Sequence, residues 1–270
     1  MPHRFLTERI RNDFTEEEPD MQRDGFLELT RTRRSIRQFK ADPVSDECVQ
    51  QILEAARWAM SGGNSQPWQY IVIRKNEIKE KLAEIYRHYR EISLAVELTR
   101  LEEYRQPAFR APGGGDAAEV SRSRFTVWSG APVVIAVLGD RRLMQASTLA
   151  ARLFEMHTFD QNLACTAYAI HLTAASLGLG AQWLSLLPPV AEAMKTAMGI
   201  PLELTLFNLN PIGYPAVAPV SHRRELGELV HQDYYDMTKF MSNDDVGKYI
   251  LHQRKQHAAG GTYKVGAKET

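Results

Sequence analysis

Apolar residues follow two spacings along the chain, one typical of helices and the other typical of strands. A spacing of three and four residues predicts amphipathic helices, and it occurs at residues 25–31, 45–60, 76–86, 147–177 and 190–198. Alternating or continuous runs of β-branched and aromatic residues predict strands, and they occur at residues 70–73, 132–138, 182–186 and 204–212. The pattern therefore predicts a protein in which helices and strands are mixed.

The predicted helix at residues 147–177 differs from the others because apolar residues occupy more than one of its faces. Gly178 and Gly180 follow it and predict where it ends. A helix of this kind must be buried inside the protein or against a partner. It is therefore the first indication of a subunit interface.

Three segments break the regular pattern and set the predicted domain boundaries. Residues 1–23 are polar and acidic in patches, which predicts a poorly ordered lead-in. Residues 97–125 alternate Arg with Glu and are interrupted by prolines and three consecutive glycines, which predicts an insertion or lid. Residues 231–270 are aromatic and polar without a clear period, so this C-terminal extension is expected to wrap another subunit or to pack at the edge of its own domain. The main domain then spans residues 24–230.

Charge and cysteine content narrow the functional classes. The chain has 33 Lys and Arg against 33 Asp and Glu, so it has no bulk attraction to nucleic acid or to acidic membranes. Its longest apolar run, residues 131–138, is well short of the roughly 20 residues that span a bilayer. Cys48 and Cys165 are too few for a disulfide framework or a thiolate metal site, and the N-terminal residues contain no stretch typical of a signal peptide. We therefore expect a small-molecule function in a reducing, cytoplasmic compartment.

Residues 31–37 contain four arginines and two hydroxyl residues. Arginine binds phosphate with two parallel hydrogen bonds, and hydroxyls add bonds to the same oxygens. A solvated basic turn is the alternative interpretation. Ile36 and Phe39 are interleaved with the charges, which indicates partial burial and favours a bound anion, because unpaired buried arginines are costly.

Residues 60–68 lie between a predicted helix and a predicted strand and contain small and amide residues. Small residues let a planar ligand approach the backbone, and Asn64 and Gln66 offer donors and acceptors to the edge of a heterocycle. Such loops are also rich in Gly, Ser and Asn for conformational reasons alone. Each of the two segments is therefore ambiguous when taken separately.

Taken together, Arg33-Arg34-Ser35-Ile36-Arg37 and the following Ser61-Gly62-x-Asn64-x-Gln66-Pro67-Trp68 resemble the FMN-dependent nitroreductase superfamily. Weaker matches are the segment at residues 178–185 and the Gly213-Tyr214-Pro215 turn followed by two arginines. The resemblance covers about residues 24–230. It implies an α+β fold with a central mixed or antiparallel sheet flanked by helices, in an intertwined homodimer whose two FMN sites lie at the subunit interface.

The resemblance also implies roles for individual residues. The arginines and Ser35 would hold the phosphate, ribityl chain and pyrimidine edge of FMN, and an arginine at that edge stabilises the negative charge of the reduced flavin. The loop that begins at Ser61 would reach the flavin from the other subunit. One arginine of the Arg223-Arg224 pair would complete the phosphate site, with Arg223 favoured. The full predicted set is Arg33, Arg34, Ser35, Arg37, Ser61, Gly62, Asn64, Gln66, Leu184, Ser185, Arg223 and Arg224.

Ser185 is the one candidate for a catalytic side chain, at the position that the resemblance places beside flavin N5. A hydroxyl there could donate a hydrogen bond to N5 and favour single-electron steps. The alternative is a serine at a strand end that is satisfied by the backbone.

Two residues depart from the family pattern. Met60 replaces a proline that is common before the Ser-Gly turn, and Ser35 stands where flavin-fragmenting members carry Asp. The second departure argues against destruction of the flavin to make a benzimidazole.

The sequence also predicts how electrons would enter and leave. No G-x-G-x-x-G follows a predicted strand, so a nicotinamide donor would have to bind transiently. This agrees with the ping-pong scheme that the resemblance implies, in which NADH or NADPH reduces FMN and leaves before the acceptor binds. No metal site is expected, because the histidines show no ligand spacing. Reduction of a nitroaromatic or quinone-like acceptor is the leading hypothesis.

Three alternatives remain. A charged lid would favour reductive dehalogenation of a small aromatic, as in the deiodinase branch of the superfamily, although a solvated insertion explains the lid equally. A non-catalytic module that stores or senses FMN is disfavoured by the open small-residue loop. RNA binding by the arginine-rich turn is disfavoured by the balanced charge.

Overall fold

The structure of the protein is a computed structural model, and it describes residues 21–105, 109–110, 115–119, 128, 130–147, 155–217, 219, 221 and 223–260. The chain divides into two compact units, residues 1–33 and residues 34–270. In the first unit, α1 (Met21–Thr32) contains the predicted helix at residues 25–31 and begins one turn earlier. The lead-in predicted for residues 1–23 lies outside the described residues as far as residue 20.

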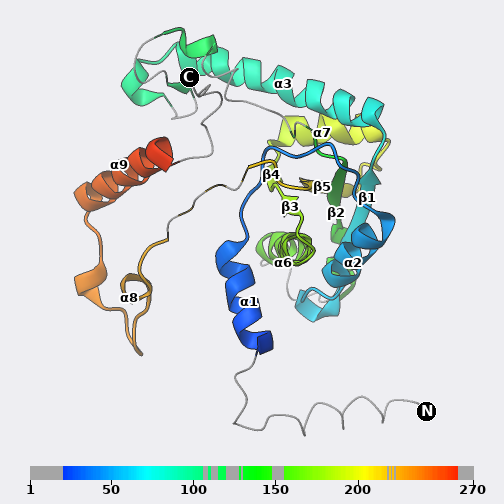
Figure 1. Cartoon of the computed structure of the whole chain (residues 1–270), viewed down its shortest axis with the longest axis horizontal. Coiled ribbons are helices and arrows are strands. Elements are labelled where there is room, and N and C mark those ends of the chain that lie inside the picture. Colours follow the sequence, from blue (N-terminus) through cyan, green and yellow to red (C-terminus); the bar gives the residue numbers. More distant parts are fainter. Residues whose placement is uncertain are drawn as a thin grey trace, which may run out of the picture. The chain divides into compact units, whose positions relative to one another are not determined.

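A five-stranded sheet forms the centre of the second unit (Figure 1). Its strands follow the order β1-β2-β5-β3, and β4 also pairs with β5. The strands are β1 (Trp68–Ile73), β2 (Val133–Asp140), β3 (Gly180–Ala181), β4 (Leu184–Ser185) and β5 (Leu204–Gly213). Each of these pairings is antiparallel, and an isolated bridge to β3 is parallel.

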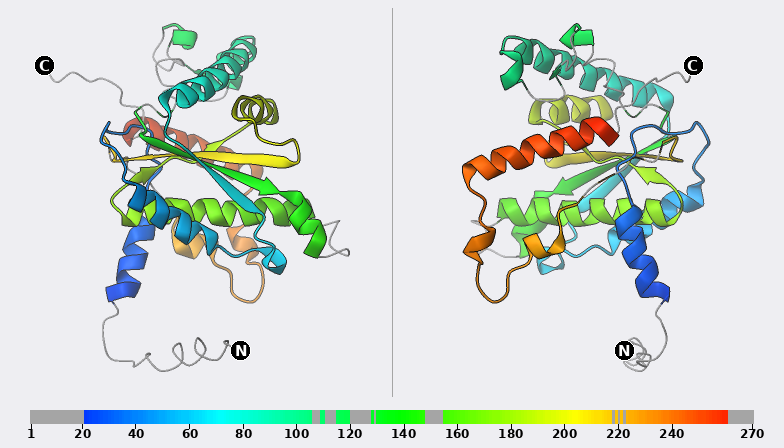
Figure 2. Two further views of the ribbon diagram at one scale, coloured as in Figure 1. Left: turned by 90° about the vertical axis from the view of Figure 1, so that its right-hand side faces the viewer. Right: turned by 60° about the vertical axis from the view of Figure 1, so that its left-hand side comes forward.

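Helices cover both faces of this sheet (Figure 2). α3 (Asn76–Leu98) and α7 (Pro188–Met198) pack on one face, whereas α2 (Asp46–Arg57) and α6 (Glu155–Ser176) pack on the other. Strand β2 contributes side chains to the hydrophobic cores on both faces of the sheet, because successive side chains of a strand point to opposite faces. The alternating residues are Val134, Ala136 and Leu138 toward α3 and α7, and Val133, Ile135 and Val137 toward α2 and α6.

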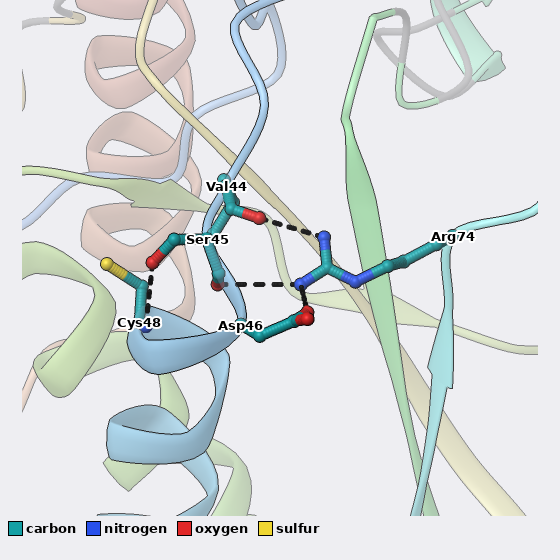
Figure 3. A network of polar contacts seen from close by, with 5 residues as sticks. All are labelled: Val44, Ser45, Asp46, Cys48 and Arg74. Carbon is teal, nitrogen blue, oxygen red and sulfur yellow. Dashed lines mark hydrogen bonds and ion pairs between the residues drawn. The ribbon is translucent and has the colours of Figure 1, made fainter.

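The start of α2 is held by the polar contacts in Figure 3. Ser45 caps the helix, because its Oγ accepts a hydrogen bond from the backbone N–H of Cys48 at 3.2 Å. Arg74 follows β1 and donates from Nη1 to the carbonyl of Val44 at 2.9 Å and from Nη2 to Asp46 Oδ1 at 2.8 Å. These bonds join the beginning of α2 to the end of β1.

One broad face of α6 is fully buried against the sheet and α2, which confirms the predicted burial of this helix. The buried apolar residues on that face are Phe159, Leu163, Ala167, Ile170 and Ala174. The opposite face is apolar from Cys165 to Leu172: these two residues are partly exposed, and Tyr168 between them is 46% exposed. In the single chain, this second apolar face is left accessible to solvent.

Three predictions of secondary structure are corrected. The strand at residues 182–186 is wrong as one strand, because β3 and β4 are separate two-residue strands divided by Gln182 and Trp183. The helix at residues 147–177 is also wrong in its extent: α5 (Arg141–Ser147) ends where it was expected to begin, α6 starts at Glu155, and residues 148–154 lie outside the described residues. Gly178 has a left-handed φ of +72° after α6, whereas Gly180 belongs to β3 rather than to the helix end.

The third correction concerns the helix predicted at residues 76–86. It continues to Leu98 as α3, so it extends into the segment predicted as a lid. The short helix η2 (Glu102–Tyr104) follows it, and most of residues 106–127 lie outside the described residues.

The C-terminal part contains α8 (Leu226–Leu229), η5 (Met237–Lys239) and α9 (Asn243–Gly260). Lys239 Nζ donates to the carbonyls of Gly227 and Val230, which joins η5 to α8. Tyr234 is 86% exposed and Phe240 is 63% exposed, and their packing on another subunit stays a prediction. Among the described helices, none combines the length and the apolar character that crossing a membrane requires.

Candidate functional site

The segment that follows the arginine cluster pairs with two distant parts of the chain. Ser35 forms a parallel bridge with Ala181, and the N–H of Ile36 donates to the carbonyl of Ala181 at 3.0 Å. Phe39 bridges Pro215 in the antiparallel sense. Gly180 allows this approach, because a Cβ atom there would overlap the side chain of Ile36. Three motifs separated in the sequence thus meet at one edge of the sheet.

The arginines of the cluster fall into both units. Arg33 is the last residue of the first unit, where its N–H donates to the carbonyl of Leu29 at 2.9 Å. Arg34 begins the second unit and is partly buried. Arg37 is also partly buried, and its Nη1 donates to the carbonyl of Ser35 at 3.4 Å. Arg34, Ser35 and Arg37 therefore lie beside β3, at partly buried positions.

Gln182, next to the Ser35 bridge, carries an unsatisfied acceptor. Gln182 is only 9% exposed, and its Oε1 atom accepts no hydrogen bond from the described residues. A buried acceptor left without a donor costs about 1–3 kcal/mol. The position fits a bound group that brings an N–H or O–H donor, which is what a heterocycle edge or a sugar chain supplies.

Strand β4 places one apolar and one hydroxyl residue next to each other. Leu184 is buried and pairs with Leu209 of β5, whereas Ser185 is exposed and pairs with Asn208. The Oγ atom of Ser185 accepts a hydrogen bond from the indole Nε1–H of Trp183 at 3.1 Å. The Ser185 hydroxyl is thus exposed and has a side-chain partner.

The loop at residues 61–66 is fixed to the start of α6. The N–H of Gly62 donates to Asn162 Oδ1 at 3.0 Å, and a Cβ atom at Gly62 would lie only 2.8 Å from Thr158 Cγ2. Ser61 Oγ accepts from the N–H of Gln66 at 3.0 Å. The loop is therefore a built structure in which glycine is needed for a close approach to the helix.

Two residues without glycine's freedom adopt left-handed backbone conformations in this loop. Asn64 has φ +52° and Gln66 has φ +45°. Asn tolerates this region, whereas Gln does so less readily. Strain of this kind is concentrated at functional sites, where the surrounding structure maintains it.

A chain of two hydrogen bonds through the buried Thr166 hydroxyl joins three elements. Thr166 of α6 donates to the carbonyl of Ala56 in α2 at 2.8 Å, and its Oγ1 accepts from the hydroxyl of Tyr70 in β1. Burial raises the pKa of Tyr70 to about 12, so this hydroxyl stays protonated and has a structural role.

The two predicted halves of the site lie at opposite ends of α6. Gly62 contacts Asn162 near the start of the helix, whereas the N–H of Leu179, just before β3, donates to the carbonyl of Ala174 near its end. Asn162 and Ala174 are separated by about 18 Å at 1.5 Å per residue. Within one chain, the loop at residues 61–66 is therefore distant from the pairing of Ser35 with Ala181.

Arg223 and Arg224 differ in their exposure and in the contacts that their side chains make. Arg224 is partly buried, donates from Nε to Glu228 Oε2 at 3.1 Å, and lies with its guanidinium 5.6 Å from the ring centroid of Tyr249. Arg223 is exposed, and its Nη1 donates to Ser221 Oγ. Arg224 thus makes contacts within the C-terminal part, and the choice between Arg223 and Arg224 as phosphate ligand stays a prediction.

Four of the described charged residues of the lid make contacts within the lid. Glu97 is buried and pairs with Arg100 Nη1 at 2.9 Å. Arg105 donates from Nε to the carbonyl of Arg100, and Arg110 donates from Nε to the carbonyl of Arg105. These contacts hold the segment together. Tyr104 is 69% exposed.

The family model described as Nitroreductase family matches residues 30–214. The chain belongs to the nitroreductase family. A relative from Methanothermobacter thermautotrophicus, provisionally named NADH dehydrogenase/NAD(P)H nitroreductase, is 28% identical over 195 residues, which are 72% of this chain and 78% of that protein. The 5,6-dimethylbenzimidazole synthase of Rhodospirillum rubrum is 26% identical over 206 residues, or 76% of this chain and 89% of the synthase.

A solved structure extends this likeness. A protein from Desulfovibrio desulfuricans, provisionally named a nitroreductase and solved in complex with FMN, matches with a TM-score of 0.53 at 28% identity, over 78% of this chain and 98% of that chain. Family membership and this match confirm the expected α+β fold with a sheet flanked by helices.

Three residues around the nitroreductase-family motifs were not found from the sequence. Asn162 holds Gly62 from a position 100 residues away, and no local pattern signals such a contact. Gln182 and Trp183 lie inside a recognised motif, and the spacing of Trp183 and Ser185 places them on the same side of an extended segment. Their contact could have been predicted.

Among the described residues, no group of three or more His, Cys, Asp or Glu is placed to hold a metal ion.

Proposed function

We propose that this chain is an FMN-dependent oxidoreductase that takes hydride from NADH or NADPH and reduces nitroaromatic or quinone-like small molecules by a ping-pong mechanism. The observation that carries this proposal is the pairing of Ser35 with Ala181, which brings Arg34 and Arg37 beside β3. The relative crystallised with FMN and the relative with an NAD(P)H nitroreductase name support the choice of cofactor and donor.

The residues present fit FMN in charge and in hydrogen bonding. Arg34 and Arg37 supply donors for the phosphate and the pyrimidine edge, and Ser35 adds a hydroxyl. The unsatisfied Oε1 atom of Gln182 would accept a hydrogen bond from the ligand. Bound FMN would supply the capacity to accept hydride and to hold two electrons between donor and acceptor.

The length of the proposed site agrees with an extended ligand. Ala181 pairs with Ile212 and Ser185 pairs with Asn208, so the two positions are four residues apart along β5. This separation is about 13 Å at 3.3 Å per residue. Ser185 would lie beside flavin N5 at one end, and the arginines would hold the polar chain toward the other.

We propose a homodimer because one chain cannot complete this site. The loop with Ser61, Gly62 and Asn64 lies at the other end of α6 from Ser35. The outer face of α6 carries Cys165, Tyr168 and Leu172, which leaves an apolar surface for a second copy. An antiparallel pair of α6 helices would bring the loop of one subunit to the arginines of its partner.

The exposure of Ser185 favours an enzyme over a storage module, since an exposed site admits a donor and then an acceptor. Among the described lid residues, the charges of Glu97, Arg100, Arg105 and Arg110 are engaged in internal contacts. These contacts therefore do not favour the dehalogenase alternative. Cys48 and Cys165 are free thiols, which supports a reducing, cytoplasmic location.

An anaerobic visible spectrum tests this function. The purified protein, reconstituted with FMN, is mixed with NADH or NADPH and then with a nitroaromatic. We expect the flavin band to bleach with the donor and to return with the acceptor. A protein that retains no FMN, or a bound flavin that neither donor bleaches, would contradict the proposal.

Subunit mixing tests the shared site. Arg34→Ala and Asn64→Ala variants are each expected to retain little FMN, because each homodimer carries two damaged sites. After the two are unfolded and refolded together, heterodimers contain one intact site, so about a quarter of all sites should bind FMN again. Recovery of none would show that each site is built within one chain.

A further inference from the structure

We propose that Trp183 is a positioning residue that fixes the Ser185 hydroxyl and strengthens it as a hydrogen-bond donor toward the bound flavin. This inference rests on the proposed function, in which Ser185 lies beside flavin N5. The indole Nε1–H donates to Ser185 Oγ at 3.1 Å. An indole N–H is only a donor, whereas a hydroxyl both donates and accepts. Trp183 therefore occupies one lone pair of Oγ and leaves the O–H to donate elsewhere.

Neighbouring rings on two elements hold the indole in place. His171 of α6 lies 5.8 Å from it, centroid to centroid, at an interplanar angle of 43°. Phe207 of β5 lies 5.8 Å away at 82°, an edge-to-face contact. Such aromatic pairs have preferred geometries. Trp183 is thus braced by a helix and by a strand.

Buried hydrogen bonds fix His171, one of the two rings that contact Trp183. His171 is 3% exposed, and its Nε2 lies 3.1 Å from Asn210 Oδ1. The Nδ2 of Asn210 donates to the carbonyl of Ile135, which fixes the orientation of the amide because a carbonyl only accepts. Asn210 Oδ1 therefore faces His171, so Nε2 of His171 carries a hydrogen. The buried contact with Asn210 therefore fixes the orientation of the imidazole ring, which is the ring that contacts Trp183.

The chemical consequence follows from how hydrogen bonds polarise one another. A hydroxyl that accepts a bond becomes a stronger donor. A hydrogen bond donated by Ser185 stabilises those states of the flavin in which N5 accepts a hydrogen bond. The fully reduced flavin is stabilised less, because its N5 carries its own hydrogen. Trp183 is thereby expected to raise the fraction of flavin that stops after one electron.

A redox titration of the FMN-loaded protein with dithionite tests this, with the one-electron-reduced fraction measured by its visible spectrum and by electron paramagnetic resonance. Trp183→Phe removes the N–H and keeps a ring between His171 and Phe207. We expect the equilibrium constant for forming one-electron-reduced flavin to fall, by at most the roughly three- to tenfold that loss of a neutral hydrogen bond produces. Ser185→Ala removes the donor itself and should fall at least as far, and the double variant should fall no further than Ser185→Ala.

Two controls separate the hydrogen bond from packing. Trp128→Phe makes the same change at a buried tryptophan that packs on Tyr86 instead, and it should leave the one-electron-reduced fraction unchanged. Incorporation of 3-benzothienylalanine at position 183 replaces N–H by sulfur and keeps the ring size. This substitution should lower the one-electron-reduced fraction as expected for Trp183→Phe, and it provides the test if Trp183→Phe folds poorly.

An unchanged fraction in the benzothienyl protein, or additive effects in the double variant, would overturn the inference. So would a Ser185→Ala protein that titrates like the natural chain, because Trp183 would then have no hydroxyl through which to act. Dithionite reduction needs only bound FMN. A protein that binds FMN but is not reduced by NAD(P)H would contradict the proposed function while leaving this inference testable.

Discussion

A Cβ atom at Gly62 would lie 2.8 Å from Thr158 Cγ2, so this position tests how closely the loop must approach α6. Gly62→Ala should destabilise the protein by about 1–3 kcal/mol through overpacking and should weaken FMN retention. Adding Thr158→Ser removes the methyl group and should restore both properties. Urea unfolding and flavin content measure them. A double variant as poor as Gly62→Ala would show that the contact with Thr158 is not the cause.

Asp140 gives a pH dependence that can be measured. Hydrogen bonds from the Arg142 side chain hold the pKa of this carboxyl below its usual value. Since the folded pKa is below the unfolded one, the carboxylate stabilises the folded protein above about pH 4, and this contribution disappears as the pH falls through the folded pKa.

Asp140→Asn should therefore be less stable at neutral pH and should lose less stability between about pH 5 and pH 2. Thermal unfolding across this range provides the measurement. Asp42, which is exposed, provides the matched control as Asp42→Asn. Parallel curves for the natural chain and Asp140→Asn would contradict the expectation.

A candidate site can be proposed from the sequence alone where single side chains carry the chemistry. Arginine forks, hydroxyls and small loop residues were recognised because their donors and sizes are written in the sequence. Asn162 and Gln182 were not, because their significance depends on what folding brings near them. Asn162 matters through Gly62, which is distant in the chain. Gln182 matters through an acceptor that burial leaves unsatisfied.

At the scale of elements, periodicity predicted the type of most helices and strands but not all of their ends. α3 runs on to Leu98 because Leu94 and Glu97 are buried in its last turns, although the alternating charges there suggested a lid. Residues 182–186 were predicted as one strand, yet regular pairing with β5 is confined to β3 and β4, and between them only a single bond, from the N–H of Gln182 to the carbonyl of Pro211, is described. Pairing partners, which no local pattern contains, decide such boundaries.

The junction of α2 with β1 allows a comparison of two kinds of interaction. Asp46 is mostly exposed, so its ion pair with Arg74 should contribute between zero and about 1 kcal/mol. The bond from Arg74 to the carbonyl of Val44 is partly buried, and its loss leaves an acceptor unsatisfied at about 1–3 kcal/mol. Arg74→Met should therefore lower the free energy of unfolding more than Asp46→Asn. Urea unfolding of both variants decides the order, and equal losses would contradict it.

At the scale of the whole molecule, the proposed dimer depends on the outer face of α6. Tyr168→Arg places a charge on that face, so we expect a monomer in sedimentation together with loss of FMN, because each site would lack its second half. Leu202→Arg is the control, since Leu202 is 85% exposed in the turn before β5. A monomeric Tyr168→Arg protein that retains FMN would contradict the shared site.

Strand β5 pairs with β2, β3 and β4, and most of its residues are buried. Its amides should therefore open only when the whole domain unfolds and should be among the slowest to exchange with deuterium. Because β3 and β4 bond to this same strand, the half of the site beside Ser185 should be protected almost as strongly. The loop at residues 61–66 belongs to no strand and should exchange much faster. The cofactor would then join a part that hardly fluctuates to one that opens readily, and FMN binding should slow exchange mainly in the loop.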